Sequence, residues 1–219
     1  MSFLNQLKSQ ATALQNEQSA QQTANDLSAH LTEAASKTAL LYLTELVKQL
    51  NVLAPGGPKL SLNGKIPWPD MKLVDFRIDA RKKRLRDKEV FDYIAMVWRL
   101  VPREGAPKAG TVSANFPPDL ERIETRLSAG VVKHERVNVR HPEKNTLQAI
   151  RFDYMEEARG GVTITADHDG AKLAFRLANL RGFGILNKSY PADQIQSALL
   201  DELAKLIVGQ PSTFIEIYD

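Results

Sequence analysis

Two neighbouring stretches of alternating apolar and polar residues restrict this chain to folds built around an antiparallel sheet. Val74, Phe76, Ile78 and Ala80 alternate with charged residues, which is the pattern of a strand with one face in water. The stretch 90–101 follows almost at once and is apolar on both sides, so we expect it nearer the centre of the sheet. The two stretches predict a β-hairpin.

The apolar faces of these two strands determine how they pair. A slip of one residue would send one apolar set to the wrong face, so the loop between the strands must have an odd length. A three-residue loop at 86–88 meets this condition. It predicts the pairs Phe76–Trp98, Ile78–Met96, Ala80–Ile94, Asp75–Arg99 and Lys82–Asp92, of which the last two join opposite charges.

Three later stretches alternate in the same way and predict a meander over 150–154, 162–166 and 173–177. Asp169-Gly170 is a strong hairpin signal. It predicts the pairs Asp167–Lys172, Ala166–Leu173, Ile164–Phe175 and Val162–Leu177. An odd loop at 158–160 would align Tyr154 with Ile164. The stretch 131–140 is predicted as a further strand without a fixed register, and 213–218 as a short terminal strand.

Helical spacing of apolar residues marks three other parts of the chain. The first is a long helix from about residue 25 to the Pro- and Gly-rich turn at 54–58, preceded by a Gln-rich segment with a weak apolar stripe. The second is a short helix at 119–127. The third begins with a capping-box-like pair, Asp193 and Gln196, and ends before Gly209.

These elements predict the α+β class: a long N-terminal helix and a curved antiparallel β-sheet of about six to seven strands. Helices, including the amphipathic C-terminal helix, are expected to cover one face of the sheet. Residues 1–22 are expected to form an amphipathic or partly disordered arm, and 23–219 a single α+β domain.

Composition excludes several classes of function. The chain has no cysteine, so disulfides, thiolate metal sites and thiol nucleophiles are excluded. Polar residues interrupt the N-terminal segment, which therefore does not read as a secretory signal, and no run of some 20 apolar residues exists elsewhere. We expect a cytoplasmic protein without membrane contact.

The residues with catalytic or metal-binding chemistry do not form a known pattern. Phosphate-binding glycine loops and the hydrolase elbow are absent from the sequence. His168 lies between two aspartates, but three ligand types on one tight turn point in divergent directions. We therefore predict no catalytic residue, no metal and no cofactor, and lean against an enzyme.

Positive charge concentrates in one segment. Residues 51–110 carry 13 Lys and Arg against 7 Asp and Glu, and six cations fall within 81–88 at the tip of the predicted hairpin. Such a ribbon can lie along a phosphate backbone, although cations also protect exposed strand ends from aggregation. The candidate nucleic-acid-binding residues are Arg77, Arg81, Lys82, Lys83, Arg84, Arg86, Lys88 and Tyr93.

A pocket between the sheet and the C-terminal helix is a second candidate site. Large side chains on the inner face of the sheet could line it, or could simply fill the core, as such residues do in most sheets. These residues are Phe76, Met96, Trp98, Phe152, Tyr154 and Phe175.

The preferred hypothesis for function rests on the N-terminal helix. Its length exceeds what one sheet face usually covers, so part of it is expected to pair with another copy or with a protein partner. The chain is thus predicted to be a non-catalytic interaction or accessory module. Nucleic-acid binding through 81–88, and an apolar-ligand carrier or enzyme with a pocket under the C-terminal helix, are the alternatives.

Overall fold

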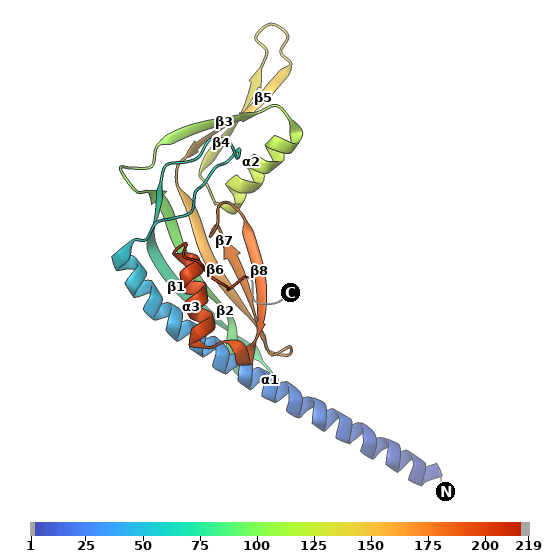
Figure 1. The fold of residues 1–219 in the computed structure, drawn as a ribbon. Coiled ribbons are helices and arrows are strands. Elements are labelled where there is room, and N and C mark those ends of the chain that lie inside the picture. The colour runs from blue at the N-terminus through green and yellow to red at the C-terminus, as the bar shows by residue number, and fades with distance from the viewer. Residues whose placement is uncertain (1–2, 216–219) are drawn as a thin grey trace.

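Eight strands form two antiparallel sheets in the computed structural model, which describes residues 3–215 (Figure 1). The larger sheet has the strand order β1-β2-β6-β7-β8, and the smaller sheet has the order β3-β5-β4. The strands are β1 (Met71–Leu85), β2 (Lys88–Pro102), β3 (Ala109–Ala114), β4 (His134–Arg140), β5 (Leu147–Met155), β6 (Ala158–Asp167), β7 (Lys172–Ala178) and β8 (Ile185–Pro191). The helices are α1 (Phe3–Leu53), α2 (Pro117–Ala129), the 3₁₀ turn η1 (Ala192–Gln194) and α3 (Ser197–Ile207).

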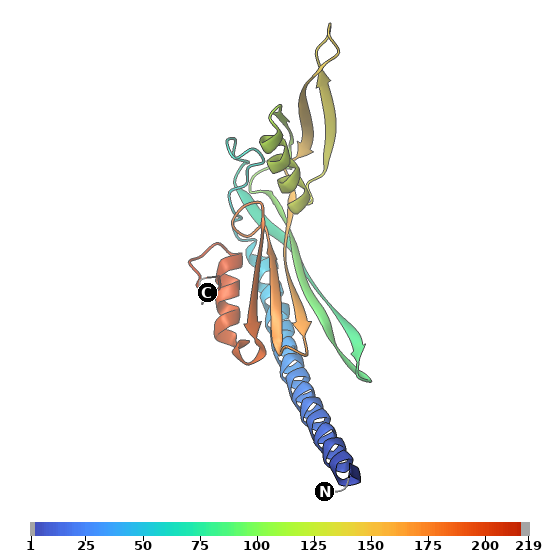
Figure 2. The ribbon, with the colours of Figure 1, turned by 90° about the vertical axis from the view of Figure 1, so that its right-hand side faces the viewer.

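The α+β class, the long N-terminal helix and the helix-covered antiparallel sheet are confirmed. Helices α1 and α3 lie together on one face of the five-stranded sheet (Figures 1 and 2). Tyr42 of α1 donates a hydrogen bond of 2.5 Å to Asp201 of α3, which joins the two helices. The pKa of the Tyr42 hydroxyl is raised above its usual value, mainly because the group is partly buried and also because it bonds to this carboxylate.

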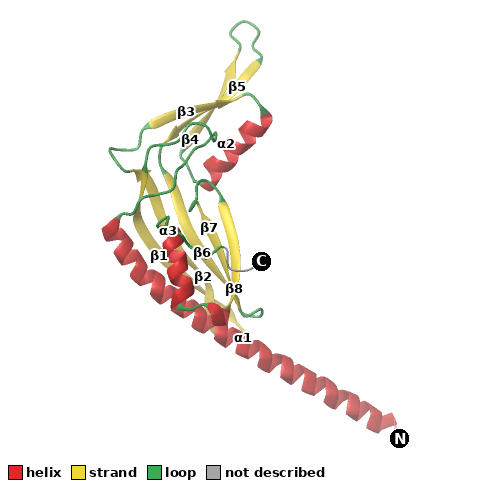
Figure 3. Cartoon of the chain, in the orientation of Figure 1, coloured by secondary structure: helices red, strands yellow, loops and turns green. Residues whose placement is uncertain are grey.

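Helix α1 is a single element of 51 residues, so the segment before residue 25 does not form a separate short helix. Its first part extends well beyond the sheets, as Figure 3 shows. Ala, Gln and Leu dominate this part, and these residues have high helix propensity. Once the body of the protein has fixed the later turns, each added residue gains a hydrogen bond without a new nucleation step, so the helix continues outward.

The first hairpin is confirmed at its centre and wrong at both ends. Ile78 lies opposite Met96 and Ala80 opposite Ile94, as predicted. The loop, however, has two residues, because Leu85 pairs with Lys88. Arg86 and Asp87 both have positive φ, 46° and 63°, as the tight hairpin turns require.

Two β-bulges reconcile this even loop with the buried faces. One shift in register falls between Arg81 and Lys82 and the other between Val74 and Arg77. Lys82 therefore lies opposite Phe91 instead of Asp92, and Arg99 lies opposite Val74 instead of Asp75. Each bulge adds one residue to one strand, so the two cancel and the apolar residues stay on the inner face.

Side chains from distant elements occupy the backbone groups at these bulges. The amide of Asn51 in α1 accepts a hydrogen bond from Phe76 N at 2.8 Å and donates one to Phe76 O at 2.9 Å. Glu33 of α1 accepts from Phe91 N at 3.0 Å, and His168 Nε2 lies 2.7 Å from Phe91 O. His168 is 3% exposed, which makes it a structural residue of the core.

The second hairpin, β6–β7, has every predicted pair. Asp167 lies opposite Lys172, Ile164 opposite Phe175 and Val162 opposite Leu177. The turn itself spans four residues, 168–171, and its positive φ falls at Ala171 instead of at Asp169 and Gly170. The pairing was therefore correct although the turn type was not.

The predicted alignment of Tyr154 with Ile164 is wrong. Strand β5 pairs with β3 and β4, while β6 pairs with β2 and β7, so consecutive strands lie in different sheets. Residues 158–160 belong to β6 and do not form a loop. Strands β3 and β8 had no predicted counterpart, and the stretch 131–140 forms β4 from His134 onward.

The C-terminal part differs in detail from the prediction. Asp193 lies in η1, and α3 begins at Ser197 after Gln196, which makes no side-chain capping bond. Thr213 has no regular structure and residues 214–215 form a turn instead of the start of a strand, and the rest of the predicted terminal strand lies outside the described residues.

One hydrophobic core joins both sheets and the three α-helices. Trp68, which is 4% exposed, stacks on Tyr154 of β5 with a centroid distance of 5.4 Å. It also meets Phe183, in the β7–β8 loop, edge-on at 5.2 Å. Trp68 therefore packs the small sheet against the end of the large one.

Candidate interaction surfaces

The first half of α1 is exposed almost throughout, and no other element covers it among residues 3–215. Phe3 and all residues from Asn5 to Ala24 are exposed, a length of about 30 Å at 1.5 Å per residue. Three of its described side chains are large and apolar: Phe3 is 74% exposed, Leu7 45% and Leu14 58%. From Thr32 onward the same helix is buried at regular intervals against the sheet.

The exposed apolar side chains continue the stripe that packs on the sheet. An α-helix has 3.6 residues per turn, so residues 36 apart are ten full turns apart and point in the same direction. Four residues of the exposed part stand in this relation to buried residues of the later part. The pairs are Phe3 and Ala39, Leu7 and Leu43, Ala11 and Val47, and Leu14 and Leu50.

The later part of α1 shows what this stripe can do when it is covered. Ala39 and Leu43 are fully buried, and Leu50 is 2% exposed in the core against the sheet. The exposed part has the same helical phase but lies beyond the end of the sheet (Figure 3). It carries few charges, Lys8 and Glu17 alone between residues 3 and 24, so little electrostatic repulsion opposes the approach of another apolar surface.

The basic hairpin tip is largely neutralised by carboxylates. Five of its six cations form ion pairs, with Arg81 as the one that has no pair in the described part of the chain. The pairs are Lys82–Glu89, Lys83–Asp92, Arg84–Asp87, Arg86–Asp169 and Lys88–Asp26. All of them lie at the surface and contribute little to stability, but they lower the charge that the tip offers to a phosphate backbone.

The two other candidate nucleic-acid residues lie at the base of this tip. Arg77 and Tyr93 are on the outer face of the large sheet, where Tyr93 lies opposite Arg81. A nucleic-acid role for the hairpin stays a prediction.

The six candidate pocket residues lie in the core. Phe76, Met96, Trp98, Phe152 and Phe175 are at most 3% exposed, and Tyr154 is half-buried against them. Phe76 contacts Trp98 with a centroid distance of 5.3 Å although the bulge removes their predicted backbone pairing. Phe152 and Tyr154 belong to the smaller sheet, so the six do not share one sheet face.

Charged groups elsewhere in the described residues show no metal-binding arrangement. Between residues 3 and 215, no group of three or more His, Cys, Asp or Glu side chains is arranged so that it could hold a metal ion. No helix in the same range is both long and apolar enough to cross a membrane.

Comparisons with models of known protein families, with curated proteins and with solved structures found no match for this chain. The fold and the exposed first half of α1 therefore provide the basis for a functional hypothesis.

Proposed function

We propose that the protein is a cytoplasmic interaction module that assembles through the exposed first half of α1. The observation that supports this proposal is the continuity of the apolar stripe: side chains in the phase that is buried from residue 32 to residue 50 are exposed from residue 3 to residue 14. Covering three large apolar side chains gains free energy at about 25 cal/mol per Å² of apolar surface removed from water.

A second copy of the chain is the proposed occupant. Two such helices can pair through their stripes, since helices associate through apolar positions three and four residues apart. Only Lys8 and Glu17 carry charge on this part, so few like-charge contacts oppose self-association. A heterologous protein that offers an apolar groove is the alternative partner.

The test is the assembly state of the full-length chain in multi-angle light scattering. Replacing Leu7 and Leu14 together by Gln removes the stripe without lowering helix propensity much. We expect the parent chain to form a dimer and this variant to be monomeric over the same concentration range. The matched control replaces Thr12 and Thr23, which lie about half a turn away from the stripe, by Gln, and should stay dimeric.

Two outcomes of this experiment would refute the proposal. A parent chain that is monomeric at all concentrations refutes self-association. If both variants have the same assembly state as the parent dimer, the stripe is not the contact surface, and the proposal is wrong.

A further inference from the structure

A groove of about 850 Å³ opens on the face of the five-stranded sheet opposite α1 and α3. Strand register places its residues in adjacent rows. One row runs Arg77, Val97, Gly161, Ala178 and Ile185 from β1 to β8. This row forms the floor of the groove, and its central side chains are small and uncharged.

Four arginines surround this floor. Arg77 is at one end of the floor row, Arg99 and Arg159 lie opposite each other in the row on one side, and Arg176 lies in the row on the other. All four line the groove. Their side chains come from four different strands, so the sheet alone brings them together.

Three of these guanidinium groups have no carboxylate partner among the described residues. Arg99 is held by Glu157 at 2.8 Å and Asp75 at 2.7 Å, and these two bonds raise its pKa further above its usual value. Arg77, Arg159 and Arg176 make no ion pair within residues 3–215. The groove therefore has an excess of positive charge in a form suited to carboxylate, sulfonate or phosphate oxygens, which arginine binds with two parallel hydrogen bonds.

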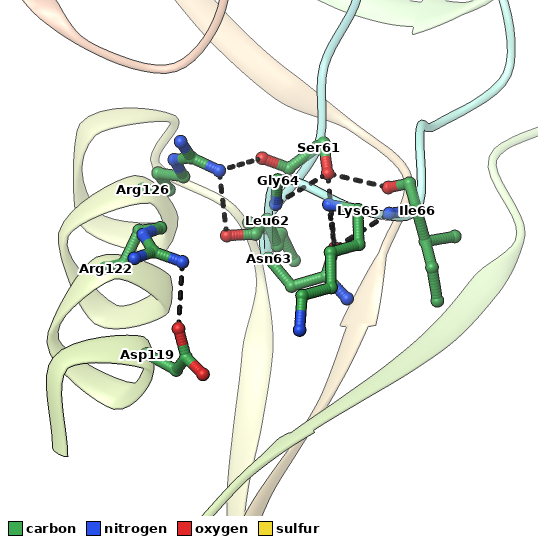
Figure 4. A network of polar contacts seen from close by, with 9 residues as sticks. All are labelled: Ser61, Leu62, Asn63, Gly64, Lys65, Ile66, Asp119, Arg122 and Arg126. Atoms are coloured by element: carbon green, nitrogen blue, oxygen red, sulfur yellow. Dashed lines mark hydrogen bonds and ion pairs between the residues drawn. The ribbon is translucent and has the colours of Figure 1, made fainter. Parts of the chain in front are cut away.

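The other side of the groove is the C-terminal half of α2. Thr125, Ser128 and Ala129 line it there, followed by Val131. Figure 4 shows how this helix is anchored beside the groove: Arg126 donates to the carbonyls of Ser61 at 2.9 Å and Leu62 at 3.2 Å. The loop that carries these carbonyls is held by Asn63, whose Oδ1 accepts from Lys65 N and Ile66 N, both at 2.9 Å.

A second anchor connects this wall to the floor. The buried amide of Asn179 donates to Ala129 O at 2.8 Å and to Arg159 O at 2.6 Å, and Arg159 N donates to Gly130 O at 2.8 Å. The end of α2 and strand β6 are therefore fixed relative to each other. A groove with a preformed wall loses less entropy on binding than one that must close around its ligand.

The geometry points to a binding site for an organic anion, with its apolar body on the floor of Val97, Gly161 and Ala178 and its acidic group on the unpaired arginines. Val97 is 47% exposed and Ile185 41%, so apolar surface is available beside the charges. The volume lies within the range of about 300–1,000 Å³ that is usual for small-molecule sites. Gly161, which has no side chain, keeps the middle of the floor open.

A small amphiphilic anion fits this surface better than a nucleic acid does. A backbone of regular phosphates needs a continuous track of cations, whereas Asp75, Asp79 and Glu157 interrupt the arginines on this face or at its rim. The apolar floor also has no partner in a phosphate backbone. A ligand with a small apolar body and one acidic group can contact the apolar floor and bind the arginines around it.

The experiment titrates the full-length chain with the fluorescent anion 1-anilinonaphthalene-8-sulfonate, which has an aromatic body and one sulfonate. Replacing Arg159 and Arg176 together by Gln should raise its Kd at least tenfold. The control Arg84→Gln with Arg140→Gln removes the same charge from two hairpin ends and should change Kd less than twofold. Val97→Gln, an exposed change in the floor, should raise Kd several-fold, and Leu7→Gln with Leu14→Gln should leave it unchanged, which makes this test independent of the proposed assembly.

Competition identifies the class of ligand. Dodecanoate and adenosine 5′-monophosphate have a carboxylate and a phosphate on apolar or aromatic bodies, and displacement of the dye by either supports the site and shows which acid it prefers. If inorganic phosphate displaced the dye as effectively as dodecanoate and adenosine 5′-monophosphate do, the apolar floor would have no role in binding. Equal Kd values for the parent and the Arg159/Arg176 variant, or displacement by a single-stranded oligonucleotide alone, would overturn the proposal.

Discussion

Asn179 offers the sharpest test of how the groove wall is held in place. It follows β7, is 1% exposed and has a φ of 62°, in the left-handed region where asparagine is tolerated. Its side chain makes three hydrogen bonds: Nδ2 donates to Ala129 O and Arg159 O, and Oδ1 accepts from Gly184 N at 2.9 Å. Three separate parts of the chain therefore depend on one amide.

Asn179→Ala removes all three bonds and leaves their backbone partners to find water. At about 1 kcal/mol for each net hydrogen bond, the loss is about 3 kcal/mol. Alanine in the left-handed region adds about 1 kcal/mol. We expect the free energy of unfolding to fall by about 4 kcal/mol, a large part of the 5–15 kcal/mol that is typical of a folded protein.

Two further substitutions separate these contributions. Asn179→Gly removes the backbone strain but not the loss of bonds, so it should remain destabilised by about 3 kcal/mol. Asn179→Asp keeps the size and the acceptor but places a carboxylate against two carbonyl oxygens. The pKa of this carboxyl group should rise in the folded state. The loss in free energy of unfolding relative to the parent should therefore be largest at neutral pH and shrink as the pH falls, because the carboxyl group then gains a proton to donate.

Urea unfolding, followed by circular dichroism and by the fluorescence of Trp68 and Trp98, measures these differences. The slope with urea should stay the same among the variants, which shows that the same surface unfolds. A loss below about 1 kcal/mol for both Ala and Gly variants would refute the reasoning, because water would then replace the amide at little cost.

Two other predictions concern a glutamate near the C-terminus and a glycine in β6. Glu202 accepts hydrogen bonds from Lys205 and from Thr213 N, and these bonds lower its pKa to about 2. Glu202→Gln should therefore destabilise the chain at pH 7, and the difference in urea midpoint between variant and parent should shrink as the pH falls from about 4.5 to 2. A difference that does not change with pH would contradict the assignment. A Cβ at Gly160 would lie 2.4 Å from Nε1 of the buried Trp98, so Gly160→Ala should cost about 1–3 kcal/mol and shift the tryptophan emission. Unchanged stability and emission would show that the indole has room to move.

The sequence contained enough information for the middle of the first hairpin but not for its ends. Alternation identifies which residues face inward, and Ile78 with Met96 follows from that alone. The even loop is accompanied by two compensating bulges, and at these bulges Asn51 and Glu33 bond backbone groups 25 and 58 residues away. The local sequence of the two strands does not indicate that side chains this far away in the sequence bond to their backbone.

The division into two sheets was beyond sequence reasoning for a related reason. β5 and β6 both alternate and are separated by Glu156 and Glu157, so proximity favours pairing them as a hairpin. The chain instead directs β6 to β2, where Ile94 meets Ile164 and Met96 meets Val162. Strands β2 and β6 both have apolar inner faces, so they pair well at the centre of a sheet. Several strands of this chain have similar faces, however, and which of them pair is determined by the whole fold.

The distribution of charge shows why sequence density is a poor guide to a charged site in this protein. The six cations of 81–88 are adjacent in sequence, and carboxylates of neighbouring strands, turns and α1 pair with five of them. Arg77, Arg159 and Arg176 are isolated in sequence, yet the strand order places them around one floor, and none of them has a carboxylate partner within residues 3–215. A cluster that is dense in sequence is usually solvated and needs nearby acids to limit its self-repulsion. Cations that only the strand order brings together, beside exposed apolar side chains, keep a positive charge that is available to a ligand. For this reason the binding experiment replaces Arg159 and Arg176 and uses Arg84 in its control.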